Sequence, residues 1–167
     1  MKSPKTAKAR TPSLSDGLER LQQQVRAGEF AAAISLSQDL IVNHPRNALL
    51  YNVLGVAHSQ MGQNEEATEA FRSAIKFEPD YGEAIGNIIT TLIVLERTVD
   101  AKPYVLKGLE LDPMNLGLRQ ILAEVLFAEG DFSGAVEHAD IVLAGRPGDI
   151  NALKVKTEVQ KAKTQIN

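Results

Sequence analysis

Residues 48–81 read ALLYNVLGVAHSQMGQNEEATEAFRSAIKFEPDY, and the same pattern of residue types recurs along the chain every 34 residues. Prolines mark this period, and an alanine stands twelve residues before each of them. Because two independent residue types share one period, chance does not explain the spacing. The prolines are Pro45, Pro79, Pro113 and Pro147, and the alanines are Ala33, Ala67, Ala101 and Ala135.

Glycine holds the turn position of three periods, at Gly28, Gly62 and Gly130, whereas the third period has Glu96 there. A turn glycine between two amphipathic stretches is typical of a helical hairpin. One hairpin cannot bury its apolar face alone, so successive hairpins stack. The sequence therefore predicts an all-α solenoid of four helix-turn-helix repeats at residues 14–47, 48–81, 82–115 and 116–149, preceded by a basic flexible tail at 1–13 and followed by a capping helix at 150–167.

The second repeat resembles the tetratricopeptide repeat family, whose signature is W-x2-L-G-x2-Y, then A-x3-F, then P. His58 stands where the family usually has Tyr. The residues in register are Tyr51, Leu54, Gly55, Ala67, Phe71, Ala74 and Pro79. The resemblance covers residues 14–149 and implies an array of helix pairs whose first helices line a concave binding surface.

The third repeat departs from the pattern most. Ile89 takes a position that is small elsewhere, Glu96 replaces the turn glycine, and Pro103 falls inside the expected second helix. Proline is tolerated only in the first turn of a helix. We therefore expect this helix to begin late, near Val99 or Asp100, and the third repeat to be irregular.

The segment after the fourth repeat predicts a ninth helix that serves as a half-repeat cap. Its apolar residues are expected to face the fourth repeat, and its charged residues are expected to meet solvent. The first set is Ile150, Leu153, Val159, Ala162 and Ile166, and the second set is Lys154, Lys156, Glu158, Lys161 and Lys163.

Composition and charge exclude several classes of function. The chain of 167 residues has no cysteine, so it has no disulfide and no thiolate metal site. Its net charge is −3, of which the first twelve residues contribute +4 and the remainder therefore −7. An acidic body argues against binding to nucleic acid. No secretory signal and no membrane span are recognisable, so a cytoplasmic location and no membrane partner are expected.

Motifs for catalysis are missing from the sequence. There is no phosphate-binding glycine loop, no G-x-S-x-G and no H-E-x-x-H, and His44, His58 and His138 have no metal-ligand spacing. We expect a chain that is not an enzyme and that binds no cofactor or metal.

The register of the repeats places a candidate peptide-binding groove on the first helices. Its middle is apolar and interspersed with amides, which suits an extended or helical peptide, and Asn52 and Asn87 are predicted to fix the peptide backbone. The alternative is that individual apolar side chains are shared between neighbouring repeats as packing. The predicted groove residues are Gln22, Val25, Leu49, Asn52, Val56, Gln60, Asn87, Thr90, Ile93, Gln120, Glu124 and Phe127.

The leading hypothesis is a protein interaction module or scaffold that binds a peptide or a partner helix. One alternative is a targeting or substrate-presenting array of a larger enzyme, similar to arrays that precede glycosyltransferase and sulfotransferase domains. Another is a homo-oligomeric scaffold that associates through the apolar run at 88–95 or through the ends of the array, although packing in the middle of the array is the favoured explanation of that run. The Lys and Asn clamp of co-chaperones that bind acidic heat-shock protein tails is missing, since the corresponding places hold Leu18, Gln22, Val53, Glu83 and Asn87.

Overall fold

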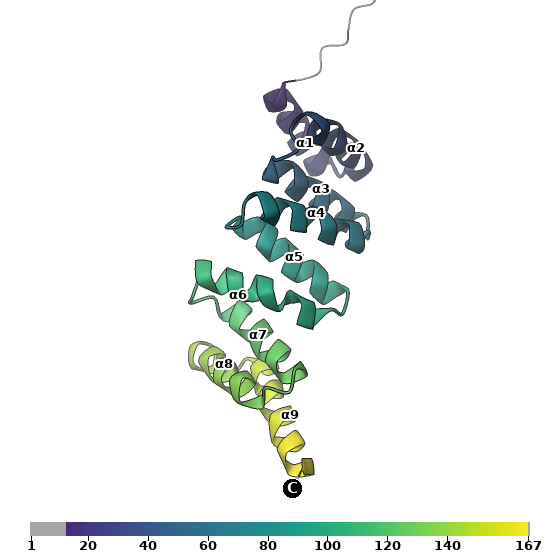
Figure 1. Cartoon of the computed structure of the whole chain (residues 1–167). Helices are drawn as coiled ribbons and strands as arrows, with labels where there is room; N and C mark the ends of the chain where they lie inside the picture. The colour runs from purple at the N-terminus through teal and green to yellow at the C-terminus, as the bar shows by residue number, and fades with distance from the viewer. Residues whose placement is uncertain (1–12, 167) are drawn as a thin grey trace, which may run out of the picture.

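The computed structural model describes residues 13–166, and within this range the chain forms nine α-helices and one short 3-10 helix, with no strand (Figure 1). The expected all-α solenoid is confirmed. The predicted basic tail lies outside the described residues, apart from Ser13. The helices are α1 Leu14–Ala27, α2 Phe30–Asn43, α3 Ala48–Gln60, α4 Asn64–Phe77, α5 Gly82–Val94, η1 Thr98–Ala101, α6 Lys102–Leu111, α7 Leu116–Ala128, α8 Phe132–Gly145 and α9 Ile150–Ile166.

The helices form two layers along an elongated array (Figure 1). The backbones of odd-numbered helices approach one another, with Cα atoms within 8 Å between α1 and α3, α3 and α5, and α7 and α9, whereas no two even-numbered helices within residues 13–166 come that close. A stack whose helices approach closely in one layer and are spread in the other is curved, with the close layer inside. The odd-numbered helices therefore line the inner side of the array.

The hairpin turns explain the recurring glycines. Gly28, Gly62 and Gly130 have φ values of 74°, 73° and 83°, the left-handed region that glycine enters without a steric penalty. Glu96 occupies the same turn position with φ of 57°. A side chain bearing Cβ is strained there, so the third repeat keeps the turn geometry at a cost in stability.

Small residues allow the paired helices to approach closely. Ala67 and Ala135 are fully buried, and a Cβ added to Gly55 would lie 2.6 Å from Cε1 of the buried Phe71 ring. Phe71 joins a core that extends across the third repeat to Leu122 of α7. The same residue columns that reveal the repeat in the sequence therefore build its core.

The third repeat is irregular, as expected, but its second helix begins at another place. The α-helix proper begins at Lys102, later than the predicted Val99 or Asp100, because the 3-10 helix η1 occupies residues 98–101. Pro103 then lies in the first turn of α6, where its missing N–H costs no hydrogen bond. The result is a helix of 10 residues where the other second helices have 14.

The helix α9 packs on α7 and α8, through a face that only partly agrees with the predicted one. Its buried residues are Ala152, Val155 and Val159, of which Val159 was predicted, while Ile150 and Leu153 are 79% and 46% exposed. The prediction was wrong for these two because the helix presents the spacing 152, 155, 159 to the core. Lys156 meets solvent as predicted, and its Nζ also pairs with Asp140 of α8 at 2.5 Å. The side chain of Ile166 lies outside the described residues.

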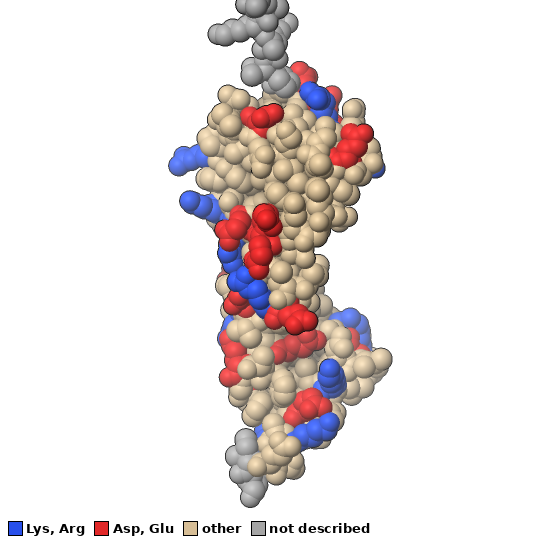
Figure 2. Space-filling view, turned by 90° about the vertical axis from the view of Figure 1, so that its right-hand side faces the viewer, with Lys and Arg blue, Asp and Glu red and all other residues tan. Residues whose placement is uncertain are grey.

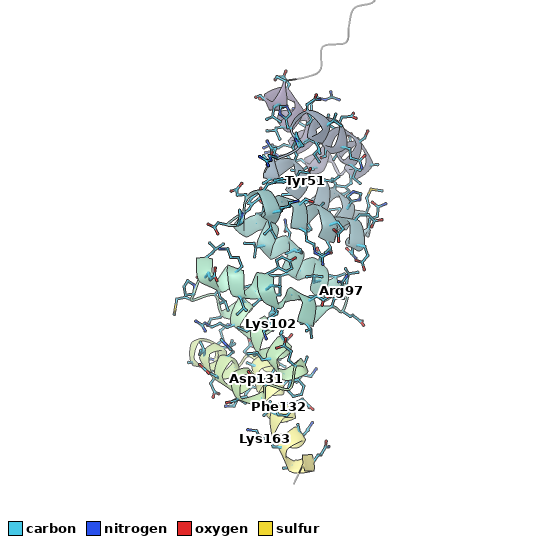
Figure 3. The ribbon with its side chains drawn as sticks, viewed as in Figure 1. Tyr51, Arg97, Lys102, Asp131, Phe132 and Lys163 are labelled. Carbon is cyan, nitrogen blue, oxygen red and sulfur yellow. The ribbon has the colours of Figure 1, made fainter. Side chains whose placement is uncertain are left out.

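Ion pairs join helices along the outside of the array. On the face shown in Figure 2, acidic and basic side chains lie beside one another in a band along the middle of the molecule. Arg97, at the turn after α5, pairs with Glu65 at 3.2 Å, and Lys102 of α6 pairs with Glu129 at 2.5 Å (Figure 3). Such half-exposed pairs each contribute about 0–1 kcal/mol. Their main effect is that the cationic side chains of Arg97 and Lys102 are held at the turn after α5 and on α6, outside the inner layer.

Candidate functional site

All twelve predicted groove residues lie on α1, α3, α5 and α7, the helices of the inner layer. Their exposure divides them into three groups. Gln22, Leu49, Gln60, Thr90 and Ile93 are exposed, whereas Asn52 is 1% exposed. The half-buried members are Val25, Val56, Asn87, Gln120, Glu124 and Phe127.

Asn52 is engaged inside the array. Its Nδ2 donates to Glu83 Oε1 at 3.0 Å and to the Tyr81 hydroxyl at 3.4 Å, and its Oδ1 accepts from Asn87 Nδ2 at 3.1 Å. These bonds use both N–H groups of the Asn52 amide. Asn52 therefore joins α3 to α5 and has no N–H left for a partner, whereas the half-buried Asn87 keeps its second N–H.

The same cluster perturbs a neighbouring tyrosine. Burial, followed by the charge of Glu83, raises the pKa of Tyr81, while the hydrogen bond from Asn52 lowers it. Burial and the negative charge of Glu83 both favour the neutral phenol over the phenolate. Tyr81 is consequently a fixed polar contact between repeats and not a proton donor poised for chemistry.

A hollow of about 370 Å³ opens between α5, the end of α6 and α7. Unlike the other neighbouring inner helices, α5 and α7 have no pair of Cα atoms within 8 Å of each other in the described range, although their side chains share the core around Leu122. This gap falls at the irregular third repeat. The lining residues are Gly82, Ile85, Gly86, Ile89, Thr90, Gly108, Leu111, Asp112, Asn115, Gly117, Leu118 and Ile121.

A second hollow, of about 390 Å³, lies between α7 and α9. Glu124 and Phe127 belong to the predicted groove, and α9 adds Asn151, Lys154 and Glu158. Sequence reasoning missed the contribution of α9, although the signal was available. Lys154 and Glu158 follow Gln120 and Glu124 by one period of 34 residues, so the groove continues into the capping helix.

The inner layer has an uneven charge. Glu83 is the one charged residue of α5, and α3 has neither Lys nor Arg nor an acidic residue. In α7 the guanidinium of Arg119 donates to the Pro113 carbonyl at 2.6 and 3.1 Å, which directs it to the loop before the helix. Glu124 accepts from Gln120 at 3.3 Å. The middle of the groove is therefore apolar and weakly acidic.

The apolar run at 88–95 lies mostly in the core. Ile88, Ile89 and Leu92 are buried against Phe71 and Val105, whereas Ile93 and Val94 are 39% and 61% exposed. Packing in the middle of the array accounts for its hydrophobicity.

Within residues 13–166 no group of three or more His, Asp or Glu side chains is arranged to hold a metal ion. His58 shares a hydrogen bond with Gln63, while burial and the nearby Arg119 lower the pKa of His138. None of the helices in this range combines the length and the hydrophobicity that crossing a membrane requires.

The fold and this lined inner layer define an α-solenoid repeat protein with a groove. Residues 48–81 match the family model for the tetratricopeptide repeat. The 34-residue period extends the same hairpin over the rest of the described array. Residues 48–81 are therefore a tetratricopeptide repeat, and the other hairpins of the described array are similar to it in period and fold.

Two curated relatives illustrate the sequence similarity. Small glutamine-rich tetratricopeptide repeat-containing protein 2 from Mycosarcoma maydis is 30% identical over 97 residues, which are 58% of this chain and 28% of that protein. Hsp70-Hsp90 organising protein from Plasmodium falciparum is 28% identical over 98 residues, which are 59% of this chain and 39% of that protein. The chain thus spans well under two thirds of the length of these relatives.

Solved structures show the same fold at low identity. The crystal structure of YrrB, described as a TPR protein with an unusual peptide-binding site, matches with a TM-score of 0.79 and 20% identity over 89% of this chain and 76% of that chain. The crystal structure of MamA matches with a TM-score of 0.76 and 17% identity over 90% of this chain and 82% of that chain. These similarities establish the fold of the array.

Proposed function

We propose that this protein is an interaction module that binds a peptide or a partner helix along the inner layer of the array. The observation that carries the proposal is the pair of hollows that α5, α7 and α9 leave open, to which Thr90, Glu124 and Phe127 of the predicted groove contribute. Hollows of about 300–1,000 Å³ with apolar walls and a few polar groups are typical of binding sites. The relatives support the proposal, since YrrB is described as having a peptide-binding site.

The alternative of an array that belongs to a glycosyltransferase or a sulfotransferase is not favoured. The relatives named above are tetratricopeptide repeat proteins and an organising protein of two chaperones, and none is named as such an enzyme. A cytoplasmic location, a non-catalytic role and the exclusion of nucleic acid and membranes complete the proposal. Self-association remains a second role of the same module.

Matched glutamine substitutions test the groove. A display library of random twelve-residue peptides is selected on the full chain, and the strongest binder is titrated by fluorescence anisotropy. Gln22→Tyr, Gln60→Tyr and Gln120→Tyr each place a bulky ring on the inner layer, whereas Gln38→Tyr on α2 and Gln160→Tyr on α9 place the same ring on exposed positions that line neither hollow.

We expect at least one inner-layer variant to lose about tenfold in affinity, which is about 1.4 kcal/mol, and both controls to bind as the unmodified chain does. If the controls lose affinity and the three inner-layer variants do not, the groove assignment is wrong. A chain that selects no peptide at all contradicts the proposal of peptide binding.

A further inference from the structure

Charge and shape in the gap between α5 and α7 point to the chemistry of the partner. Asp112 is the one charged residue among those that line the gap, and the other walls are aliphatic side chains and glycines, with Thr90 and Asn115 as the neutral polar members. A Cβ built on Gly82 or Gly86 would meet no heavy atom within 4 Å, so the floor beside α5 is open. The gap is therefore an apolar recess that a partner side chain can enter.

Acidic groups adjoin this recess along both helices. Glu83 follows Gly82 in α5, and Glu124 lies one turn beyond Ile121 in α7. Neither carboxylate forms an ion pair with any Lys or Arg of the described chain, since each is engaged by the neutral amide of Asn52 or Gln120. An unneutralised carboxylate beside an apolar recess favours a cationic partner group over an anionic one.

The cations of the neighbouring elements are committed elsewhere. Arg97 pairs with Glu65 and Asp100, Lys102 pairs with Glu129, and Lys107 pairs with Asp80 and Glu110. Arg119 is held by the Pro113 carbonyl. In Figure 3, Arg97 is labelled beside the turn after α5 and Lys102 on α6, so both belong to the edge and outer layer of the third repeat. Lys154 of α9 is the exception, since it lines the same hollow as Glu124. On the α5 side of the recess, Glu83 presents a carboxylate with which no Lys or Arg of the described chain forms an ion pair.

We propose that the groove selects a partner segment in which an aliphatic residue is flanked by Lys or Arg. The aliphatic side chain enters the recess beside Gly86, and the cationic groups lie against Glu83 and Glu124. This inference rests on the proposed function, since it names the class of peptide that the same groove takes. Such a cationic segment has the opposite charge to an acidic peptide tail, which the carboxylates of Glu83 and Glu124 would repel.

The closing experiment uses the random twelve-residue display library on the full chain, with each strong binder then synthesised in three forms. One form is unchanged, one has every Lys and Arg replaced by Gln, and one has its aliphatic residues replaced by Ala. We expect enrichment of Lys, Arg and aliphatic residues, an affinity that falls as salt rises, and a loss of about tenfold or more in each altered peptide.

Gly86→Leu supplies the decisive protein variant. Its Cβ meets no heavy atom within 4 Å and the rest of its side chain extends into the recess, and leucine favours helix over glycine, so we expect the variant to stay folded, which circular dichroism checks. We expect it to lose about tenfold in affinity, and Glu83→Gln combined with Glu124→Gln to remove most of the salt dependence. Ala144→Leu, at an exposed position of α8, is the matched control and should bind as the unmodified chain does.

The outcomes separate the two proposals. If peptides bind the groove but are enriched in Asp and Glu or lack any charge preference, or if Gly86→Leu binds them unchanged, the inference about the partner is wrong while the groove stands. If binding is insensitive to every inner-layer substitution, both the inference and the proposed function fail.

Discussion

The side-chain amides of Asn52 in α3 and Asn87 in α5 form a hydrogen bond of 3.1 Å across two repeats, with Asn87 as the donor. Both had been predicted as contacts for a peptide backbone. Asn52 instead connects the repeats, because Glu83 and Tyr81 accept its two N–H groups. Buried amides that satisfy one another specify one arrangement of the helices, since any other leaves polar groups unpaired.

Asn52→Ala should therefore act on stability. Removing the buried amide breaks its hydrogen bonds with the half-buried Asn87 and with the charged carboxylate of Glu83, at a cost of about 1–3 kcal/mol in the free energy of unfolding. Urea denaturation measures this cost, and Gln60→Ala at an exposed position serves as the control.

A double-mutant cycle with Asn87→Ala identifies the pair as the cause. The double variant should lose less free energy of unfolding than the sum of the two single losses. We expect the difference to be about 0.5 kcal/mol or more. Additive losses would mean that the Asn52–Asn87 bond contributes nothing.

Gly55→Ala and Gly86→Ala form a matched pair of helix substitutions with opposite expected results. The new Cβ at residue 55 lies within 3 Å of three atoms of the buried Phe71 ring, whereas at residue 86 it meets no atom within 4 Å. Alanine favours helix by about 0.5–1 kcal/mol, so Gly86→Ala should be stabilising. Overpacking of about 1–3 kcal/mol should make Gly55→Ala destabilising.

Thermal denaturation followed by circular dichroism distinguishes the two. Combining Gly55→Ala with Phe71→Leu should recover part of the loss, because the smaller side chain vacates the position of the ring. A stabilised Gly55→Ala variant would show that α3 and α4 do not pack as closely as described.

The left-handed turn at Glu96 predicts a reciprocal pair of changes. Glu96→Gly relieves the strain of a Cβ at φ of 57° and should raise the free energy of unfolding by about 1 kcal/mol. Gly62→Glu introduces the same strain at φ of 73°, with no neighbour within 4 Å to clash, and should lower it by a similar amount. Urea unfolding of both variants checks the pair, and changes of the same sign would contradict the turn geometry.

His138 should make stability depend on pH below neutrality. Burial, with Arg119 as the second cause, holds its folded-state pKa below the ordinary value of about 6.5. As the pH falls through that value the unfolded chain binds a proton that the folded chain resists, so the free energy of unfolding decreases until the lowered pKa is reached. His138→Gln removes this contribution.

The measurement is urea unfolding at about pH 8 and about pH 5 for both proteins, so that the titration of carboxylates common to both cancels. The loss of stability on acidification should be smaller in His138→Gln than in the unmodified chain. An equal loss in both proteins would exclude His138 as a source of the pH dependence.

The sequence was sufficient for the fold because its repeating columns are packing residues. The repeat pattern implies the contacts that Gly55, Ala67 and Phe71 make. The position of Pro103 predicted that the third repeat is irregular. The start of α6 was missed because a 3-10 turn has no distinct sequence signal. The buried face of α9 was missed because Ile150 and Leu153 are apolar and yet exposed.

The groove could be predicted only in outline. The register of the repeats placed all twelve residues on the inner helices. It could not show that Asn52 points into the array and that its two N–H groups donate to Glu83 and Tyr81. The recess beside Gly86 depends on the distance between α5 and α7, which no single column of the repeat encodes. Packing columns predict where helices lie, whereas the openings between them depend on departures from the repeat.

Chemical-shift mapping by NMR tests the central claim most directly, since a chain of 18.1 kDa is suited to it. Spectra of the amide-labelled chain are recorded with the display-selected peptide added in steps. Binding in the groove predicts that the largest shifts fall on the inner helices, around Val56, Thr90 and Glu124. Shifts confined to the outer helices α2, α4, α6 and α8, with those three residues unmoved, would contradict it.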